Sequence, residues 1–161
     1  MKELKESEEI PKEEEKKKIN YSKQGKKNRA AGRIFETKVR EDLEKMGWFV
    51  NKWVNTIDYT KNKIVPAKRK YNPFLKILAI GTGFPDFVCF KRDSEGNYEV
   101  IGLEVKGNGY LDQVEKGMCF WLIENKVFSR ILIAKKIKEG IRTKIEYINF
   151  IEKYKKDFPE Q

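Results

Sequence analysis

The sequence contains no histidine, and this absence removes several kinds of chemistry. Ser-His-Asp triads, imidazole general bases and histidine-containing zinc sites all require a side chain that the protein lacks. Its two cysteines, Cys89 and Cys119, are far apart and form no CxxC pair. We expect them to be reduced thiols in the core, with a disulfide as the alternative. Hydrolytic chemistry would therefore depend on carboxylates, lysines and a hard metal ion.

Long apolar runs are also missing, and the N-terminal residues contain no apolar segment of the kind found in signal peptides. A membrane-spanning helix needs about 20 consecutive apolar residues. We therefore expect a cytoplasmic protein of an archaeal, viral or bacterial cell interior, with no membrane partner.

Positive charge is what the chain has in excess: 35 Lys and Arg against 25 Asp and Glu give a formal net charge of +10. This balance favours a polyanionic partner, with nucleic acid first and an anionic membrane second. The alternative is a solvated charged surface of the kind found in thermophilic proteins.

The charge pattern divides the chain into an arm and one domain. Residues 1–29 have almost no large apolar side chains, so we expect a flexible charged arm. Residues 30–161 are predicted to form a single domain, with a basic insertion at about 55–80. The insertion combines basic and aromatic side chains, which favours nucleic-acid contact, although an ordinary surface excursion anchored by its aromatics would look the same.

Apolar periodicity predicts a mixed sheet with flanking helices. Apolar residues recur at helical spacing from Ile34 to Met46, and the helix ends at Gly47. The other expected elements are strands at 48–54, 84–92, 98–107 and 128–136, a helix at 110–126, and a strand passing into a short helix at 143–154.

Two acidic residues and a lysine are predicted to meet where two of these strands pair. Asp86 lies near the start of one strand, and Glu104 and Lys106 lie near the end of the next. In a hairpin, the start of the first strand is beside the end of the second. Two adjacent carboxylates repel each other unless a cation intervenes, and hard oxygen ligands suit Mg²⁺ or Mn²⁺. The alternative is a charged cluster on a solvent-facing sheet.

These residues resemble a known nuclease superfamily. Pro85–Asp86 followed by Glu104–Val105–Lys106 is similar to the motif of the PD-(D/E)xK nucleases. The preceding segment, with Gly32, Arg33 and Glu36, resembles the first helix of archaeal Holliday-junction resolvases, and Gln113 resembles a glutamine of the virus-type replication and repair nucleases. The resemblance implies an α/β fold, a restriction-endonuclease-like mixed central sheet flanked by helices with an αβββαβ core.

The resemblance also implies roles for individual residues. Asp86, Glu104, Glu36 and the Val105 carbonyl would hold Mg²⁺, for which Mn²⁺ would substitute. Lys106 would position the attacking water, and Gln113 would orient Lys106 or touch the cleaved strand. Basic and aromatic side chains of the arm, the first helix and the insertion are expected to contact DNA: Lys26, Lys27, Arg33, Lys68, Arg69, Lys70 and Tyr71.

The expected activity is metal-dependent hydrolysis of DNA phosphodiester bonds, with a Holliday junction or other branched DNA as the leading substrate. A homodimer would place two sites on two strands. The alternatives are a flap, repair or restriction-type nuclease of the same fold, a nucleic-acid-binding module without catalysis, and a basic RNA-binding protein, which would leave the carboxylates unexplained.

Overall fold

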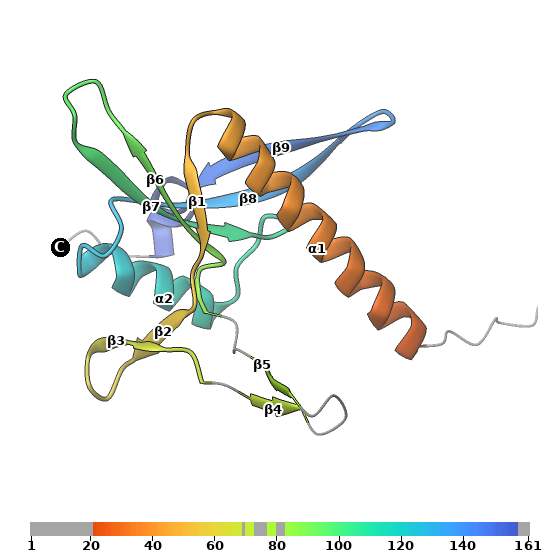
Figure 1. Ribbon diagram of the computed structural model, residues 1–161, viewed down its shortest axis with the longest axis horizontal. Coiled ribbons are helices and arrows are strands. Elements are labelled where there is room, and N and C mark those ends of the chain that lie inside the picture. The colour runs from red at the N-terminus through yellow and green to blue at the C-terminus, as the bar shows by residue number, and fades with distance from the viewer. Residues whose placement is uncertain (1–20, 69, 73–76, 80–82, 158–161) are drawn as a thin grey trace, which may run out of the picture.

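The computed structural model describes residues 21–68, 70–72, 77–79 and 83–157 (Figure 1). The helices in this part of the chain are α1 (Tyr21–Lys45), α2 (Gln113–Glu124) and α3 (Phe150–Tyr154), followed by a 3-10 turn at Lys155–Asp157. The strands are β1 (Phe49–Lys52), β2 (Asn55–Asp58), β3 (Lys63–Pro66), β4 (Lys70–Asn72), β5 (Ile77–Ala79), β6 (Phe87–Arg92), β7 (Tyr98–Val105), β8 (Ile131–Glu139) and β9 (Arg142–Asn149).

Five of these strands form one mixed sheet in the order β1-β6-β7-β8-β9. The pairs β1–β6, β6–β7 and β8–β9 are antiparallel, and β7–β8 is parallel. The parallel pair requires a crossover connection, which α2 supplies. The structure thus confirms a mixed α/β fold, in which the β2–β3 and β4–β5 hairpins stand between β1 and β6 in the chain.

Helix α1 begins earlier than the sequence pattern indicated. Residues 21–29, expected to belong to a flexible arm, form its first turns, while the rest of the predicted arm lies outside the described residues. Residues 22–33 contain no large apolar side chain, so apolar periodicity could not reveal this part of the helix. It consists mainly of good helix formers and continues from the packed half of α1. No helix in the described part of the chain has the length and apolar character needed to cross a bilayer.

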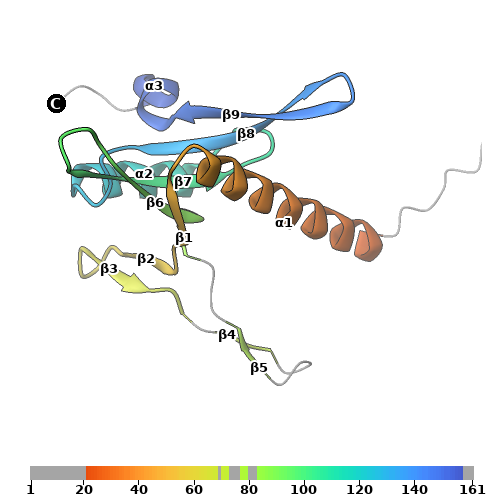
Figure 2. The same ribbon diagram turned by 45° about the horizontal axis from the view of Figure 1, so that its top comes forward.

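The two faces of the sheet carry separate apolar cores. On one face, Phe35, Val39 and Leu43 of α1 pack against buried residues of β1, β6, β7 and β8. On the other face, α2 and α3 pack against β8, and Figure 2 shows α1 in front of the sheet and α2 behind it. Cys89 is buried in the first core and Cys119 in the second, which confirms the prediction that both are core residues, and neither forms a disulfide in this structure.

The predicted basic insertion has two structurally different parts. The β2–β3 hairpin belongs to the core, because Ile57 is buried with α2 and Trp121 Nε1 donates to Asn62 Oδ1 at 2.8 Å. The β4–β5 hairpin extends away from the sheet (Figures 1 and 2). Within the predicted insertion, therefore, the β2–β3 hairpin belongs to the core, whereas the β4–β5 hairpin lies away from the sheet.

Candidate active site

The pairing of β6 with β7 brings Asp86 and Glu104 together. Phe87 pairs with Leu103, so Asp86, one residue before β6, lies beside Glu104. The Glu104 Oε2 atom accepts from the Asp86 backbone N–H at 3.0 Å, and Asp86 Oδ2 accepts from the Val105 N–H at 3.0 Å. The predicted proximity is thereby confirmed, and each carboxylate is fixed by the backbone of the other strand.

Glu104 is the one charged residue that is buried in the described part of the chain, with 6% of its surface exposed. Burial, together with the charge of Asp86, raises the pKa of Glu104 to about 8. Burial also raises the pKa of Asp86. The hydrogen bond from the Val105 N–H and the charge of Lys52 lower this pKa, but burial outweighs them. Burial and the Asp86 charge therefore favour the protonated form of Glu104, and a cation placed between the two carboxyl groups would favour the ionised form instead.

Lys106 lies beside Glu104 and is held by α2. Its Nζ atom is 3.5 Å from Glu104 Oε1 and donates to Glu115 Oε1 at 2.5 Å. Burial lowers the pKa of Lys106, but the hydrogen bonds and charges of Glu115 and Glu104 outweigh burial and leave the pKa raised. Lys106 is therefore a fixed cation in this structure.

Glu115 is a residue that the sequence prediction missed. Its Oε2 atom accepts from the Asp112 N–H at 3.0 Å, and the Asp112 side chain accepts from the Glu115 N–H at 2.8 Å. This capping box starts α2 and aims the second oxygen of Glu115 at Lys106. The spacing of Asp112 and Glu115 in the sequence is typical of a capping box. It does not predict the contact between Glu115 and Lys106.

Gln113 was predicted either to orient Lys106 or to touch the cleaved strand. It is the first residue of α2, and its side chain is exposed. In this structure Glu115 holds Lys106, so the first of the two roles falls to a different residue of the same helix. Contact of Gln113 with a nucleic-acid strand stays a prediction.

Lys52 is a second residue that the prediction missed, and it lies between Glu36 and Asp86. Its Nζ atom donates to Glu36 Oε2 at 2.7 Å and is 3.6 Å from Asp86 Oδ1. Alternation along β1 places Lys52 on the same face as the buried Val50, the face that α1 covers. Glu36 thus reaches the site from α1, as predicted, but contacts Asp86 through a lysine.

The predicted DNA-contacting residues fall into two groups. Lys26, Lys27 and Arg33 are exposed on α1, and Lys68 is exposed between β3 and β4. Lys70 and Tyr71 belong to strand β4, and Arg69 lies outside the described residues. The first half of α1 extends beyond the sheet (Figure 1), and no acidic residue occurs between Tyr21 and Phe35.

The donor set around Asp86 and Glu104 suits a hard cation that keeps several waters. Among the described residues no three acidic or cysteine side chains are clustered as a complete protein-only metal cage. Mg²⁺ is commonly bound by one or two carboxylates together with water and substrate phosphate, so a two-carboxylate site with the Val105 carbonyl fits it. Glu104 is buried and held by the backbone, so it is already placed for such a site.

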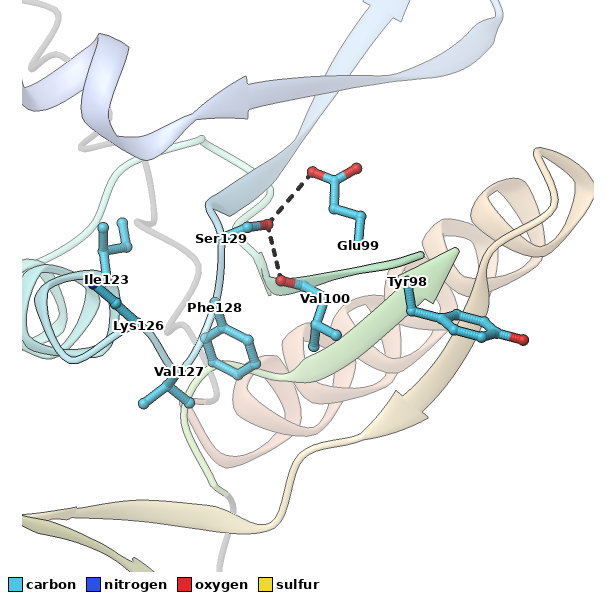
Figure 3. Close-up of a pocket in the computed structure, with 8 residues that line it drawn as sticks. All are labelled: Tyr98, Glu99, Val100, Ile123, Lys126, Val127, Phe128 and Ser129. Atoms are coloured by element: carbon cyan, nitrogen blue, oxygen red, sulfur yellow. Dashed lines mark hydrogen bonds between the residues drawn. The ribbon is translucent and has the colours of Figure 1, made fainter. Parts of the chain in front are cut away.

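A separate hollow lies at the other end of β7. It has a volume of about 480 Å³ and is lined by residues from β7, the end of α2 and the segment before β8 (Figure 3). Its carboxylate, Glu99, forms an ion pair with Arg130 at 3.0 Å, and the Tyr98 ring points away from the other lining residues. Asp86 and Glu104 do not line this hollow, so it is separate from the candidate site.

Comparison of the chain with protein-family models, with curated proteins and with solved structures finds no match. Its function is therefore inferred from the geometry and chemistry of the site.

Proposed function

We propose that this protein is a metal-dependent endonuclease that hydrolyses DNA phosphodiester bonds, with a restriction-endonuclease-like core of the PD-(D/E)xK type. The observation that carries the proposal is the mutual bonding of Asp86 and Glu104 across β6 and β7, with Lys106 beside Glu104. A solvent-facing charged cluster would leave its carboxylates exposed, whereas Glu104 is buried. Burial of an acid next to another acid costs stability, which is expected at a site that binds a cation.

Each residue of the site would have a different role in hydrolysis. Asp86, Glu104 and the Val105 carbonyl would hold Mg²⁺, and Glu36 would join them if Lys52 moved away. The ion, when bound, would neutralise charge on the phosphate and activate water. Lys106, fixed by Glu115, is placed to orient a water molecule or to stabilise negative charge on a phosphate oxygen.

Affinity for the substrate would come from the first half of α1. Lys26, Lys27 and Arg33 are exposed on a part of the helix that extends beyond the sheet and carries no acidic side chain. Contacts of this kind bind phosphates without reading the base sequence. This favours an enzyme that selects DNA by its structure, and branched or junction DNA is the leading substrate.

One observation favours a second candidate, a nucleic-acid-binding module without catalysis. Glu36 and Asp86 are already paired with Lys52, and Glu104 is already paired with Lys106. Internal pairs of this kind could complete a purely structural network. The two candidates make different predictions for Asp86, because a binding module would not need its carboxylate to act on DNA.

The deciding experiment measures cleavage and binding separately. Labelled four-way junction, flap, duplex and single-stranded DNA are incubated with the full chain at fixed salt, with Mg²⁺ or Mn²⁺ or with EDTA. We expect cleavage that requires the metal and disappears in Asp86→Ala and Lys106→Ala, while binding in EDTA persists. Wild-type protein that binds these substrates but cleaves none of them would support the binding module instead.

The oligomeric state is tested by the same preparation. A homodimer would carry two sites and would cut a junction symmetrically, so the mass of the protein alone and with a junction is measured by light scattering. A monomer in both conditions would contradict symmetric cutting by a homodimer. It would not contradict the proposed hydrolytic site.

A further inference from the structure

The loop between Lys106 and α2 is firmly held although most of it is exposed. The Gly109 N–H donates to the Lys106 carbonyl at 2.7 Å, and the Lys136 N–H donates to the Gly107 carbonyl at 3.1 Å. The Asn108 side chain accepts from the Tyr110 N–H at 3.0 Å. A side chain on this loop is therefore presented in a defined place relative to Lys106.

The residue presented is Tyr110, whose exposed fraction is 66%. It belongs to neither apolar core. The Lys153 ammonium lies 4.2 Å from the centre of the ring, and the same group donates a hydrogen bond to the Gly109 carbonyl. One lysine therefore anchors the loop and restrains the ring, without burying the ring.

Two further lysines act on the charge of Lys153. The stem of Lys135 packs against Gly109, and burial together with the charges of Lys135 and Lys116 lowers the pKa of Lys153. Lys116 is paired with Asp157, and Lys135 is paired with Glu146. Lys153 forms no ion pair with a described residue, although the Glu146 carboxylate, which is paired with Lys135, also acts on its charge, so its ammonium can contact an external anion.

The loop that carries Tyr110 adjoins the candidate site. Contacts run from Glu36 on α1 through Lys52, Asp86 and Glu104 to Lys106. The loop that carries Tyr110 starts at Lys106, at the opposite end of this series from α1. A strand whose phosphate reached Lys106 would meet an aromatic ring and a lysine on that side.

We propose that Tyr110 and Lys153 form a strand-binding contact beside the hydrolytic site, in which Tyr110 stacks on a nucleobase and Lys153 attracts the adjoining phosphate. The ligand class is an unpaired or splayed segment of a polynucleotide, because a base within a duplex has no free face for stacking. The inference rests on the proposed function to the extent that the protein must bind nucleic acid. It adds a preference for substrates with an unpaired segment, such as flaps and open junctions.

A matched pair of tyrosines allows a direct test. Tyr98 is exposed to a similar extent, 58%, but lies at the other end of β7. Full-length wild-type protein, Tyr110→Ala, Tyr110→Phe and Tyr98→Ala are titrated in EDTA with a single-stranded oligonucleotide that carries 2-aminopurine. Stacking on an aromatic side chain contributes about 1–3 kcal/mol per base, so Tyr110→Ala should bind roughly 5- to 150-fold more weakly and lose the fluorescence quenching. Tyr110→Phe and Tyr98→Ala should bind like wild type.

The outcomes separate this inference from the proposed function. If wild-type protein binds the oligonucleotide and Tyr110→Ala binds it equally well, the stacking contact is wrong and the proposed function stands. If wild-type protein binds no nucleic acid at low salt, both are wrong. Thermal melting of each variant checks the fold, and Tyr110→Leu, which keeps a side chain beneath Lys153 but no aromatic face, replaces the alanine variant if that variant melts early.

Discussion

Replacing Glu104 by glutamine should remove a large part of the pH dependence of the free energy of unfolding. Burial and the charge of Asp86 raise the pKa of Glu104 from its ordinary value of 4.5 to about 8. The folded protein therefore keeps a proton that the unfolded chain releases as the pH passes the ordinary value. Stability from this group is complete below the unfolded pKa and is lost as the pH rises through the folded pKa.

The size of the effect follows from the two pKa values. The whole difference corresponds to about 5 kcal/mol, and about 3 kcal/mol of this is lost between about pH 4.5 and pH 7. Glutamine has nearly the same shape, can accept from the Asp86 N–H and does not titrate. Its amide would lie near the Lys106 ammonium, but Glu115 still pairs with that lysine. We therefore expect a folded variant with a flatter stability profile.

The measurement is urea unfolding of metal-free protein in EDTA at a series of pH values from about 5 to 9, followed by tryptophan fluorescence and circular dichroism. The matched control is Glu95→Gln, the same chemical change at an exposed turn residue. Wild type and Glu95→Gln should lose stability in parallel as the pH rises. The free energy of unfolding of Glu104→Gln should therefore increase relative to both. Parallel profiles for wild type and Glu104→Gln would show that the Glu104 carboxyl is not held protonated by its surroundings, and the reasoning would fail.

Three further predictions concern Lys52, Glu115 and the core beneath α1. Lys52→Met removes the cation between two carboxylates and should tighten Mn²⁺ binding by about tenfold, measured by calorimetry on apo protein; unchanged affinity would mean that Lys52 does not compete with a metal. Glu115→Gln should lower the pKa of Lys106, followed by NMR of the lysine side chain, and an unmoved titration would show that Glu115 does not control it. Leu43→Ala should cost about 2–5 kcal/mol in urea unfolding, whereas the exposed Ile34→Ala should change stability by about 0.5 kcal/mol or less; similar values for both would contradict the core assignment.

The sequence predicted the main sheet and its order of elements because the apolar pattern is strong where strands are buried. The alternation from Ile101 to Val105 specifies which residues of β7 face α1, and it also determines that Glu104 and Lys106 face α2. Hairpin pairing then places Asp86 beside Glu104. These steps depend only on local periodicity and on the pairing of consecutive strands.

The parts that were missed depend on contacts between segments far apart in the chain. Lys52 meets Glu36 because α1 crosses the end of β1, and no pattern within either segment specifies that crossing angle. The start of α1 was missed for a different reason, since its first turns bury nothing. The β2–β3 hairpin was predicted to belong to a surface insertion because basic residues recur along the segment that contains it. Its one buried residue in the core, Ile57, packs against α2.

The charge balance of the site supports the proposed cation-binding site over a purely structural network. Contacts link four carboxylates and two lysines in a series: Glu36, Lys52, Asp86, Glu104, Lys106 and Glu115. With every group ionised the series carries two negative charges, inside a protein whose net charge is +10. A structural network in a chain this rich in lysine would gain from further cations, because unpaired buried charge is costly. Protonation of Glu104, which its burial and the Asp86 charge favour, would balance part of this deficit, and a divalent cation bound by the two carboxylates would balance it in place of the proton.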